Sequence, residues 1–380
     1  MSRRRFIALV GSGAVVAAGT GLGLRLTRSA EAAAAPWRMA GAPLYTEPRR
    51  RALSFAILAP NPHNMQPWTV DLSTPGEVRL FVDTDRLLPH TDPFNRQITI
   101  GLGCFLELMR MAAAEDGWRV ETELFPEGSD AMALDARPVA VCRFIEGDAT
   151  PDPLFAQVPH RRSVKEPYDT ERPVPREALD RALADVRQLR AGGTVAGADI
   201  AALRALTAEA STIEMNTPRT HKESVDVFRI GAAEVNAQPD GIDITGAMIE
   251  ALSMTGLFTR EASLDKDSPS FAAGRDLVLS QMRTSMGFAW LVSEANTRVD
   301  QIAAGRDWLR VHLALTREGI AMQPVSQALQ EYPEMLELHK AVHDRLAPDG
   351  GTVQMLARLG YHAPVPPSPR WPLEAKLTEG

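Results

Sequence analysis

Two short segments of the chain carry side chains whose types and spacing suit the binding of a ligand. The first is a loop, residues 60–68, that contains three prolines and presents the amide groups of Asn64 and Gln66. Because these prolines exclude a helix, the backbone is held rigid before the strand that follows. Two amides on such a segment offer donors and acceptors that can read the edge of a flat polar heterocycle. A capping turn before an edge strand is the alternative interpretation.

The second segment places three cations and a hydroxyl within five residues: Arg161, Arg162, Ser163 and Lys165. This set is chemically suited to a phosphate, because a guanidinium group donates paired hydrogen bonds to phosphate oxygens. A solvated run of charge at a domain junction is the alternative interpretation.

Both segments resemble parts of one family, the nitroreductase-fold FMN proteins. The pattern APxxxNxQPW at 59–68 resembles their flavin-contacting loop, and RRSVKxPY at 161–168 resembles the phosphate-binding start of that fold. The segment 304–320 resembles the long helix and glycine turn near the flavin ring. Residues 354–361, with PRxP at 369–372, resemble the terminal strand and tail that complete the phosphate site.

The order of these motifs resembles the fused-dimer (Acg-like) branch of the family. In ordinary members the RRSxK segment precedes the NxQPW loop, and two subunits build the sites at their interface. Here the order is reversed, which implies an α+β nitroreductase fold with two pseudo-symmetric halves, residues 36–150 and 151–380, in a monomer that forms an internal pseudo-dimer. Because the second half has no copy of NxQPW, we expect one complete flavin site.

The resemblance also implies residue roles. Arg161 and Ser163 would hold the FMN phosphate and ribityl chain with Arg162 behind them, and Lys165 would stabilise the reduced flavin electrostatically. Asn64 would hydrogen-bond to the pyrimidine edge of the ring. The remaining expected cofactor contacts are His63, Gln66, Met322, Gln323, Pro324 and Arg370.

Two further implications concern chemistry. Hydride transfer belongs to the flavin, so no catalytic side chain is expected. The sequence departs from the family pattern at Trp371, where a second arginine commonly follows Arg370. For His63 we expect a ring contact; a proton-donor role is a conjecture.

The elements that must position these residues mix strands with more helix, in no clean alternation, which predicts an α+β fold. Expected strands are 68–72, 78–83, 119–125, 138–144 and 353–359. Expected helices are 47–58, 97–118, 176–189, 200–210, 223–236, 287–304, 306–317 and 335–346. The apolar segment 241–268 is expected to form a lid over the flavin, and the proline-rich tail from Tyr361 to lie extended across another part of the protein.

Charge and the N-terminus bear on partners and location. The formal charge is −7, and without residues 1–35 there are 36 basic against 47 acidic residues, which argues against nucleic-acid binding. Residues 1–35 begin SRRRFI after the initiator methionine, continue with a glycine-diluted apolar run and end rich in alanine. They resemble a twin-arginine signal, which implies export by the twin-arginine machinery. An uncleaved signal would instead anchor the protein in a membrane.

Other candidate groups have ordinary explanations. Cys104 and Cys142 are expected to be buried small hydrophobes, with a disulfide as the alternative. His339 and His343 could share a metal, but no third ligand is evident, so we expect a surface helix and no metal site. Four methionines could form a lid over the cofactor or an adaptable core, namely Met248, Met254, Met282 and Met286, and we favour a core position for the last two.

Three functional hypotheses follow. The first is an FMN-dependent oxidoreductase that takes electrons from NAD(P)H and gives them to a nitroaromatic or quinone acceptor. The second is an exported flavin-sequestering protein with little turnover, which export favours because NAD(P)H is cytoplasmic. The third is a scaffold that has lost cofactor binding, against which the intact loop and phosphate segments argue.

Overall fold

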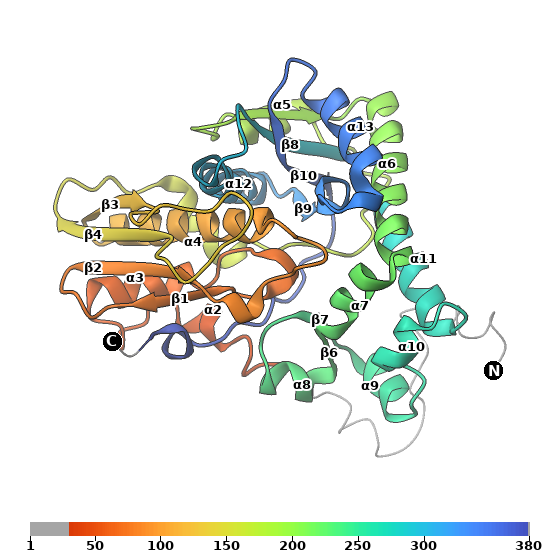
Figure 1. Cartoon of the computed structure of the whole chain (residues 1–380), viewed down its shortest axis with the longest axis horizontal. Helices are drawn as coiled ribbons and strands as arrows, with labels where there is room; N and C mark the ends of the chain where they lie inside the picture. Colours follow the sequence, from red (N-terminus) through yellow and green to blue (C-terminus); the bar gives the residue numbers. More distant parts are fainter. Residues whose placement is uncertain (1–29, 379–380) are drawn as a thin grey trace.

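The structure is a computed structural model that describes residues 30–378 (Figure 1). The expected signal, residues 1–35, lies outside this part of the chain except for residues 30–35. The α+β prediction is confirmed.

Two four-stranded antiparallel sheets have the same topology. The first has the strand order β1-β2-β4-β3, with β1 Trp68–Asp71, β2 Glu77–Val82, β3 Trp118–Leu124 and β4 Ala140–Glu146. The second has the order β5-β8-β10-β9, with β5 Arg190–Thr194, β8 Gly287–Ser293, β9 Ala321–Pro324 and β10 Thr352–Gly360. In each half a long helix follows the second strand. The protein therefore consists of two pseudo-symmetric halves.

These two helices, α4 (Arg96–Glu115) and α12 (Arg298–Arg317), pack against each other. Residue 96 corresponds to residue 298, an offset of 202 positions that also relates Gly103 to Gly305. A Cβ at Gly103 would lie 2.3 Å from the Ile302 carbonyl oxygen, and one at Gly305 would lie 2.0 Å from the Ile100 carbonyl oxygen. Because 302 and 100 are also 202 apart, this contact marks the pseudo-twofold relation between the halves.

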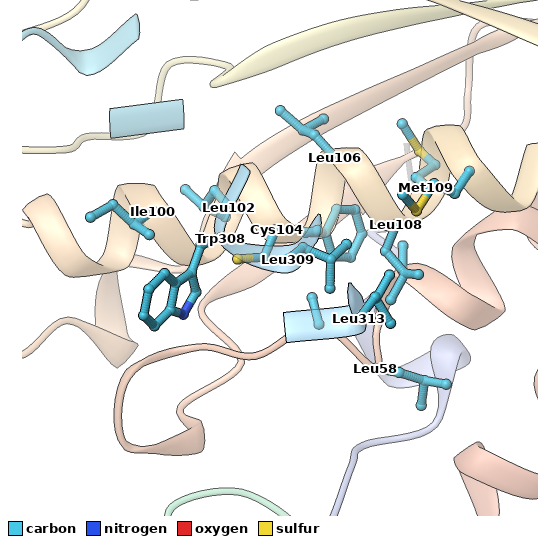
Figure 2. Close-up of a cluster of buried hydrophobic side chains, with 14 of the residues drawn as sticks. Leu58, Ile100, Leu102, Cys104, Leu106, Leu108, Met109, Trp308, Leu309 and Leu313 are labelled. Atoms are coloured by element: carbon cyan, nitrogen blue, oxygen red, sulfur yellow. The ribbon is translucent and has the colours of Figure 1, made fainter. Parts of the chain in front are cut away.

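The main core gathers around this helix pair. Apolar side chains of both helices, among them Ile100, Leu102, Trp308, Leu309 and Leu313, form one cluster (Figure 2). Helix α4 has the length and hydropathy of a membrane span, but it is buried in this core. Burial of its apolar surface is sufficient to explain that hydropathy.

The halves differ by an insertion between β5 and β8, which extends to one side of the molecule (Figure 1). Its elements are α6 Gly197–Asn216, α7 Pro218–Asp226, β6 Phe228–Ile230, α8 Gly231–Ala237, β7 Ile242–Ile244, α9 Ala247–Met254, α10 Arg260–Leu264 and α11 Pro269–Arg283. The equivalent connection in the first half is the short turn between β1 and β2. The expected lid, residues 241–268, is thus one part of a larger inserted subdomain.

The remaining helices lie outside the two sheets, and the C-terminal tail packs on the first half. Helices α2 (Ala35–Met39) and α3 (Pro48–Ala56) precede the first sheet, α5 (Arg176–Leu183) precedes β5, and α13 (Leu336–Leu346) precedes β10. The tail after β10 crosses to the first sheet, where Leu377 pairs with Val70. The expectation of an extended tail is confirmed for residues 361–372, after which Leu373–Lys376 form a 3-10 helix.

Several sequence predictions of local structure are wrong. Residues 287–304 were expected to be helical, but 287–293 form the central strand β8, and one helix spans 298–317. The run GFAWLVS is buried on both faces, and a short, continuously apolar segment has no period that separates strand from helix. The expected helix 223–236 is divided by strand β6, and helix 176–189 ends at Leu183 before strand β5.

Candidate functional site

The loop before β1 has an unusual backbone. Three non-glycine residues, His63, Asn64 and Gln66, have φ values of 45°, 55° and 51°, in the left-handed region. Such conformations cost on the order of 1–3 kcal/mol each and persist only where surrounding contacts fix them. The amide N–H of Gln66 donates to the Oδ1 of Asn61 at 2.7 Å, which closes the loop.

Gln66 is completely buried and anchors the loop to other parts of the chain. Its Nε2 donates to the Pro239 carbonyl oxygen at 2.7 Å, and its Oε1 accepts from the Trp371 N–H at 2.9 Å. Its own carbonyl oxygen accepts from the Lys376 Nζ at 2.8 Å. The structure thus gives Gln66 a positioning role, with its amide group fully engaged by protein.

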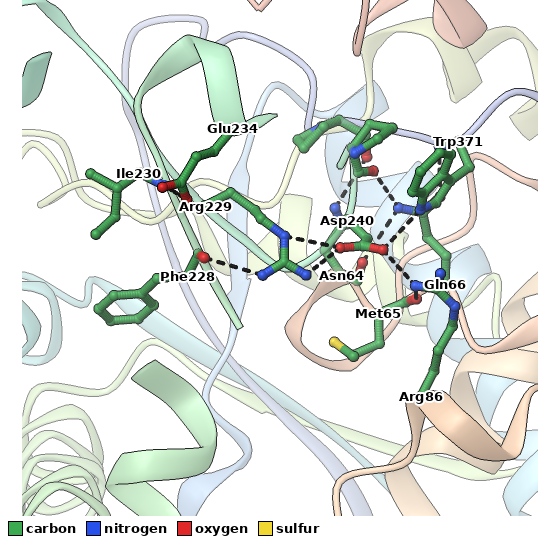
Figure 3. A network of polar contacts seen from close by, with 12 residues as sticks. Asn64, Met65, Gln66, Arg86, Phe228, Arg229, Ile230, Glu234, Asp240 and Trp371 are labelled. Carbon is green, nitrogen blue, oxygen red and sulfur yellow. Dashed lines mark hydrogen bonds and ion pairs between the residues drawn. The ribbon is translucent and has the colours of Figure 1, made fainter. Parts of the chain in front are cut away.

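A buried carboxylate, Asp240, joins the same segments (Figure 3). It accepts from Arg229 at 2.6 Å, from the Trp371 Nε1 at 2.8 Å and from Arg86 at 2.5 Å. Burial opposes its ionisation, but hydrogen bonds from Trp371, Arg86 and Arg229 hold the pKa of Asp240 below its usual value. The neighbouring Gly241 N–H donates to the Asn64 carbonyl oxygen at 3.1 Å. The insertion is therefore fastened directly to the loop.

Three arginines, Arg161, Arg162 and Arg370, form what we call the arginine cluster. Arg161 and Arg370 are buried and both donate to the Leu58 carbonyl oxygen just beyond α3, at 2.8 and 3.1 Å. Arg370 also donates to the Oδ1 of Asn64, while the Nδ2 of Asn64 donates to the Pro369 carbonyl oxygen at 3.1 Å. The tail thereby occupies both ends of the Asn64 amide.

The indole of Trp37 lies over this cluster. Its ring centroid is 5.5 Å from the guanidinium carbon of Arg161, 4.8 Å from that of Arg162 and 5.5 Å from that of Arg370. The Trp37 Nε1 donates to the Ser368 carbonyl oxygen at 2.8 Å. Cation–π attraction lowers the cost of bringing the cations together but adds no negative charge.

The arginine cluster lacks a counter-anion within the described part of the chain. No carboxylate of residues 30–378 lies within 4.0 Å of a nitrogen in these three side chains. The Nε atoms of Arg162 and Arg370 are buried and have no hydrogen-bond partner there. Burial and the neighbouring guanidinium groups lower the pKa of Arg370 to about 9. Unpaired buried donors with excess positive charge suit an anion such as a phosphate.

The segment after the cluster runs beside β9. The Val164 N–H donates to the Met322 carbonyl oxygen at 3.0 Å, and Ser163 pairs with Met322. Arg358, fully buried in β10, fixes this arrangement, because it donates to the side chain of Gln323 and, at 2.7 Å, to the Glu166 carbonyl oxygen. The structure thus places Ser163 beside Met322. Gln323 and Pro324 follow Met322 directly in β9.

Two imidazoles lie near these cations. Burial and the nearby charge of Lys165 lower the pKa of His63 to about 4. Burial and Arg161 lower the pKa of His312 to about 3, and its Nε2 lies 3.0 Å from the Arg162 carbonyl oxygen. Both rings are therefore neutral at neutral pH, and the Nδ1 of each is buried without a partner in residues 30–378. Lys165 itself is half exposed, with its Nζ 3.7 Å from Asp243.

The structure therefore brings together the expected residues of both halves. The sequence analysis missed Trp37, Asp240, Asp243 and His312. Trp37 follows the expected signal directly, and a lone aromatic residue there carries no pattern that points to a binding site. Asp240 and His312 are ordinary polar residues whose burial only the tertiary structure shows.

The remaining candidates have structural roles. Cys104 and Cys142 are free and buried, so the disulfide alternative is wrong. His343 donates from Nδ1 to the His339 carbonyl oxygen and accepts at Nε2 from the Val353 N–H, which leaves it no lone pair for a metal. No group of metal-binding side chains is found in residues 30–378. Met282 is a core residue, as expected, and Met286 packs against the core.

Comparison with known proteins agrees with the motifs. The chain is 28% identical over 331 residues to Putative NAD(P)H nitroreductase Rv3131 of Mycobacterium tuberculosis, covering 84% of this chain and 88% of that protein. It is 36% identical over 89 residues to Putative NAD(P)H nitroreductase acg of the same organism, covering 23% of this chain and 27% of that protein. No family model matches the chain. The long alignment supports the nitroreductase fold.

Two solved structures share a partial likeness. The FMN-dependent nitroreductase NfnB from Mycobacterium smegmatis, in complex with NADPH, is 18% identical with a TM-score of 0.36, covering 59% of this chain and 96% of that chain. A nitroreductase from Anabaena variabilis, described as putative, is 11% identical with a TM-score of 0.40, covering 80% of this chain and 82% of that chain.

Proposed function

We propose that the protein is an FMN-binding oxidoreductase of the nitroreductase type. In this proposal NAD(P)H donates a hydride, and a nitroaromatic or quinone acceptor then takes up the two electrons together with protons. The observation that carries the proposal is the arginine cluster, which has no counter-anion among residues 30–378 and adjoins a strained loop fixed by contacts from distant parts of the chain. The long similarity to a protein named as an NAD(P)H nitroreductase supports it.

The residues present fit FMN. Arg161, Arg162 and Arg370 would hold the phosphate, because no carboxylate of residues 30–378 lies within 4.0 Å of their nitrogens and the Nε atoms of Arg162 and Arg370 have no partner there. Ser163 pairs with the backbone of Met322 and would contact the ribityl chain. When bound, the flavin supplies the hydride and electron chemistry; the protein supplies position and charge.

Three residues expected to contact the flavin ring, Lys165, Asn64 and Gln66, would each have a different role. Lys165 would place positive charge near the ring while paired with Asp243. Asn64 would bind the ring edge with the second N–H of its Nδ2 or the second lone pair of its Oδ1, because Pro369 and Arg370 each engage one of the two. Gln66 would hold the loop rather than touch the flavin, because its amide is engaged.

The first experiment identifies the cofactor. The protein is purified, its flavin is released by denaturation and then identified by chromatography, and we expect FMN rather than FAD because the cluster suits a terminal monophosphate. A colourless protein that cannot be reconstituted with FMN would contradict the proposal.

Flavin sequestration with little turnover is a second candidate, favoured by the fastening of the insertion to the loop. The Gly241 N–H donates a hydrogen bond to the Asn64 carbonyl oxygen, and the Gln66 side chain donates one to the Pro239 carbonyl oxygen. Asp243 lies 3.7 Å from the Lys165 Nζ. These contacts would resist the opening that nicotinamide needs to reach the flavin.

One measurement separates the two candidates. FMN-loaded protein is mixed anaerobically with excess NADH or NADPH while the flavin absorbance is followed. Bleaching within seconds, reversed by a quinone or nitroaromatic, supports the oxidoreductase. If dithionite bleaches the flavin but neither nucleotide does, sequestration or a different electron donor is the better account. Deletion of residues 241–268 should then restore bleaching if this segment blocks access.

We also propose export by the twin-arginine route, on the resemblance of residues 1–35 to such a signal. Replacing both Arg3 and Arg4 by lysine should retain the protein in the cytoplasm, measured by cell fractionation. Unchanged export of that variant would contradict the proposal.

A further inference from the structure

The pseudo-twofold relation gives the proposed flavin site a corresponding position elsewhere in the molecule. The proposed flavin site is built from the loop before β1, from α12 and β9, and from the tail after β10. The corresponding elements are the loop before β5, α4, β3 and the segment after β4. All four contribute to a single cavity of about 400 Å³, lined among others by Arg110, Val120, Asp152 and Arg187. We call it the mate cavity.

The correspondence holds for individual residues. With the offset of 202 positions, Arg110 on α4 corresponds to His312 on α12, which contacts the arginine cluster through Arg162. Val120 on β3 corresponds to Met322 on β9. The mate cavity thus occupies the position that a second flavin would take in a symmetric pair.

The mate cavity is not built for a flavin. The loop before β5, which corresponds to the strained loop at 61–66, is closed by buried Asp307. This carboxylate accepts from the N–H groups of Arg187, Gln188 and Leu189 at 3.0, 2.7 and 2.8 Å. The backbone donors that could read a ring edge are therefore consumed. No counterpart of residues 161–165 is among the residues that line the cavity.

The arginines behind its wall are held in ion pairs. Arg110, Arg187, Arg306 and Arg310 surround the buried carboxylates Glu107 and Asp152, and Arg310 also lies 3.9 Å from Asp185. The deeply buried Arg310 donates to Asp152 at 2.6 Å and lies 3.3 Å from Glu107. These carboxylates are thus neutralised by arginines of the protein, among them Arg110 and Arg187. Of the charged residues that line the cavity itself, three are arginines, Arg110, Arg119 and Arg187, and two are carboxylates, Asp148 and Asp152.

The outer part of the cavity adds one more cation and one carboxylate. Arg119 lines it but also pairs with Glu121, and exposed Asp148 lies on the rim. Trp118, Pro151 and Pro153 supply an apolar wall. Arginines beside a small, partly apolar cavity favour a compact oxyanion.

We propose that the mate cavity binds one small oxyanion, a phosphate or the phosphate group of a small molecule, and that it holds no flavin. The two halves would then have diverged from one ancestral arrangement into a cofactor site and an anion site. The proposal does not depend on turnover.

The test is calorimetric titration with inorganic phosphate, in excess FMN so that the arginine cluster is occupied. Ionic strength is kept constant with chloride, because screening alone changes such interactions. We expect one phosphate per chain, and about tenfold weaker binding in Arg187→Gln, the loss of one charged hydrogen bond. Arg187 is more than half exposed, and Arg310 still pairs with Asp152 in the variant, so folding should be preserved.

Arg143→Gln is the matched control, because Arg143 is similarly exposed and paired but does not line the cavity. It should bind phosphate as the wild type does. Equal affinity in Arg187→Gln and wild type, no phosphate binding at millimolar concentration, or two FMN per chain would each overturn the proposal. If the protein bound no FMN, phosphate bound at the cluster would be weakened by Arg162→Gln and not by Arg187→Gln, so the two failures are distinguishable.

Discussion

The guanidinium carbon of Arg162 lies 4.8 Å from the centre of the Trp37 ring, so a residue just beyond the expected signal covers the cations expected to bind phosphate. The same ring contacts Arg161 and Arg370, and its N–H is fixed by the Ser368 carbonyl oxygen. One aromatic side chain thus joins the N-terminal segment, the start of the second half and the C-terminal tail.

Replacing Trp37 by alanine should weaken FMN binding. Loss of cation–π attraction costs about 0.5–2 kcal/mol, which corresponds to about a 2- to 30-fold change in Kd. Trp37→Phe keeps an aromatic face and should recover most of the affinity. Flavin fluorescence titration measures both variants. Identical affinities for Trp37→Ala and wild type would show that the ring does not support the cluster in the bound state.

Arg161→Ala should weaken FMN binding by about 1.5–3 kcal/mol if its charged hydrogen bond to the phosphate forms. Without ligand, the stability of the folded protein should fall less than the FMN affinity. The variant also removes the repulsion between Arg161 and Arg370, which adds to burial in lowering the pKa of Arg370. Comparing Tm with and without FMN separates the two effects. Unchanged FMN affinity would return Arg161 to a structural role, in which it only supports the Leu58 carbonyl.

The stability of the protein should depend on Gly103 and Gly305, at which the two long helices α4 and α12 make contact. In Gly305→Ala the new Cβ would lie 2.7 Å from the Gly103 Cα as well as 2.0 Å from the Ile100 carbonyl oxygen. Because both are backbone atoms, the helices must separate, at a cost of about 1–3 kcal/mol or more. Urea unfolding measures the loss.

Gly274→Ala is the control for that substitution. Gly274 lies inside α11, and no atom of residues 30–378 outside its own stretch of helix lies within 4 Å of an added Cβ, so alanine there should stabilise by about 0.5–1 kcal/mol through helix propensity. A similar loss of stability in both variants would mean that the contact between the helices is not the cause.

Stability should fall on acidification because of His312. Its pKa is about 3 in the folded protein against 6.5 in the unfolded chain, owing first to burial and then to Arg161. Between these values the unfolded state binds more protons, so the free energy of unfolding decreases as pH falls, by up to about 1.4 kcal/mol per pH unit from this group.

The His312→Gln variant should lack this contribution. The difference in unfolding free energy between wild type and variant should therefore shrink as pH falls from 6.5 toward 4, while other titrating groups cancel in the comparison. A difference that stays constant over that range would contradict the assignment of a buried, neutral imidazole.

Asp240→Asn should loosen the attachment of the insertion. The change leaves buried Arg229 without its carboxylate, and breaking a buried pair costs about 3–5 kcal/mol. Asp276→Asn, on the exposed face of α11, should leave stability within about 0.5 kcal/mol of wild type. If the insertion limits access, bleaching of bound flavin by NADPH should also be faster in Asp240→Asn than in Asp276→Asn.

The sequence alone determined which side chains the loop 60–68 and the segment 161–165 offer to a ligand. Prolines around Asn64 and Gln66 require a rigid loop, and the types of residues at 161–165 suit a phosphate, because these properties are local to a few neighbours. The strands beside polar turns, such as β1 and β2, and the amphipathic helices were also predictable, because one face of each meets solvent and leaves a period in the sequence.

Tertiary structure decided everything that depends on burial and on distant pairing. Strand β8 was predicted as helix, because a segment buried on both faces shows no period. The contacts by which Gln66 anchors the loop depend on Pro239 and Trp371, which lie far along the chain. The same is true of Trp37 above the arginines and of the mate cavity between α4 and the loop before β5. Such sites arise where packing brings separate segments together and removes water, and no local sequence pattern specifies that event.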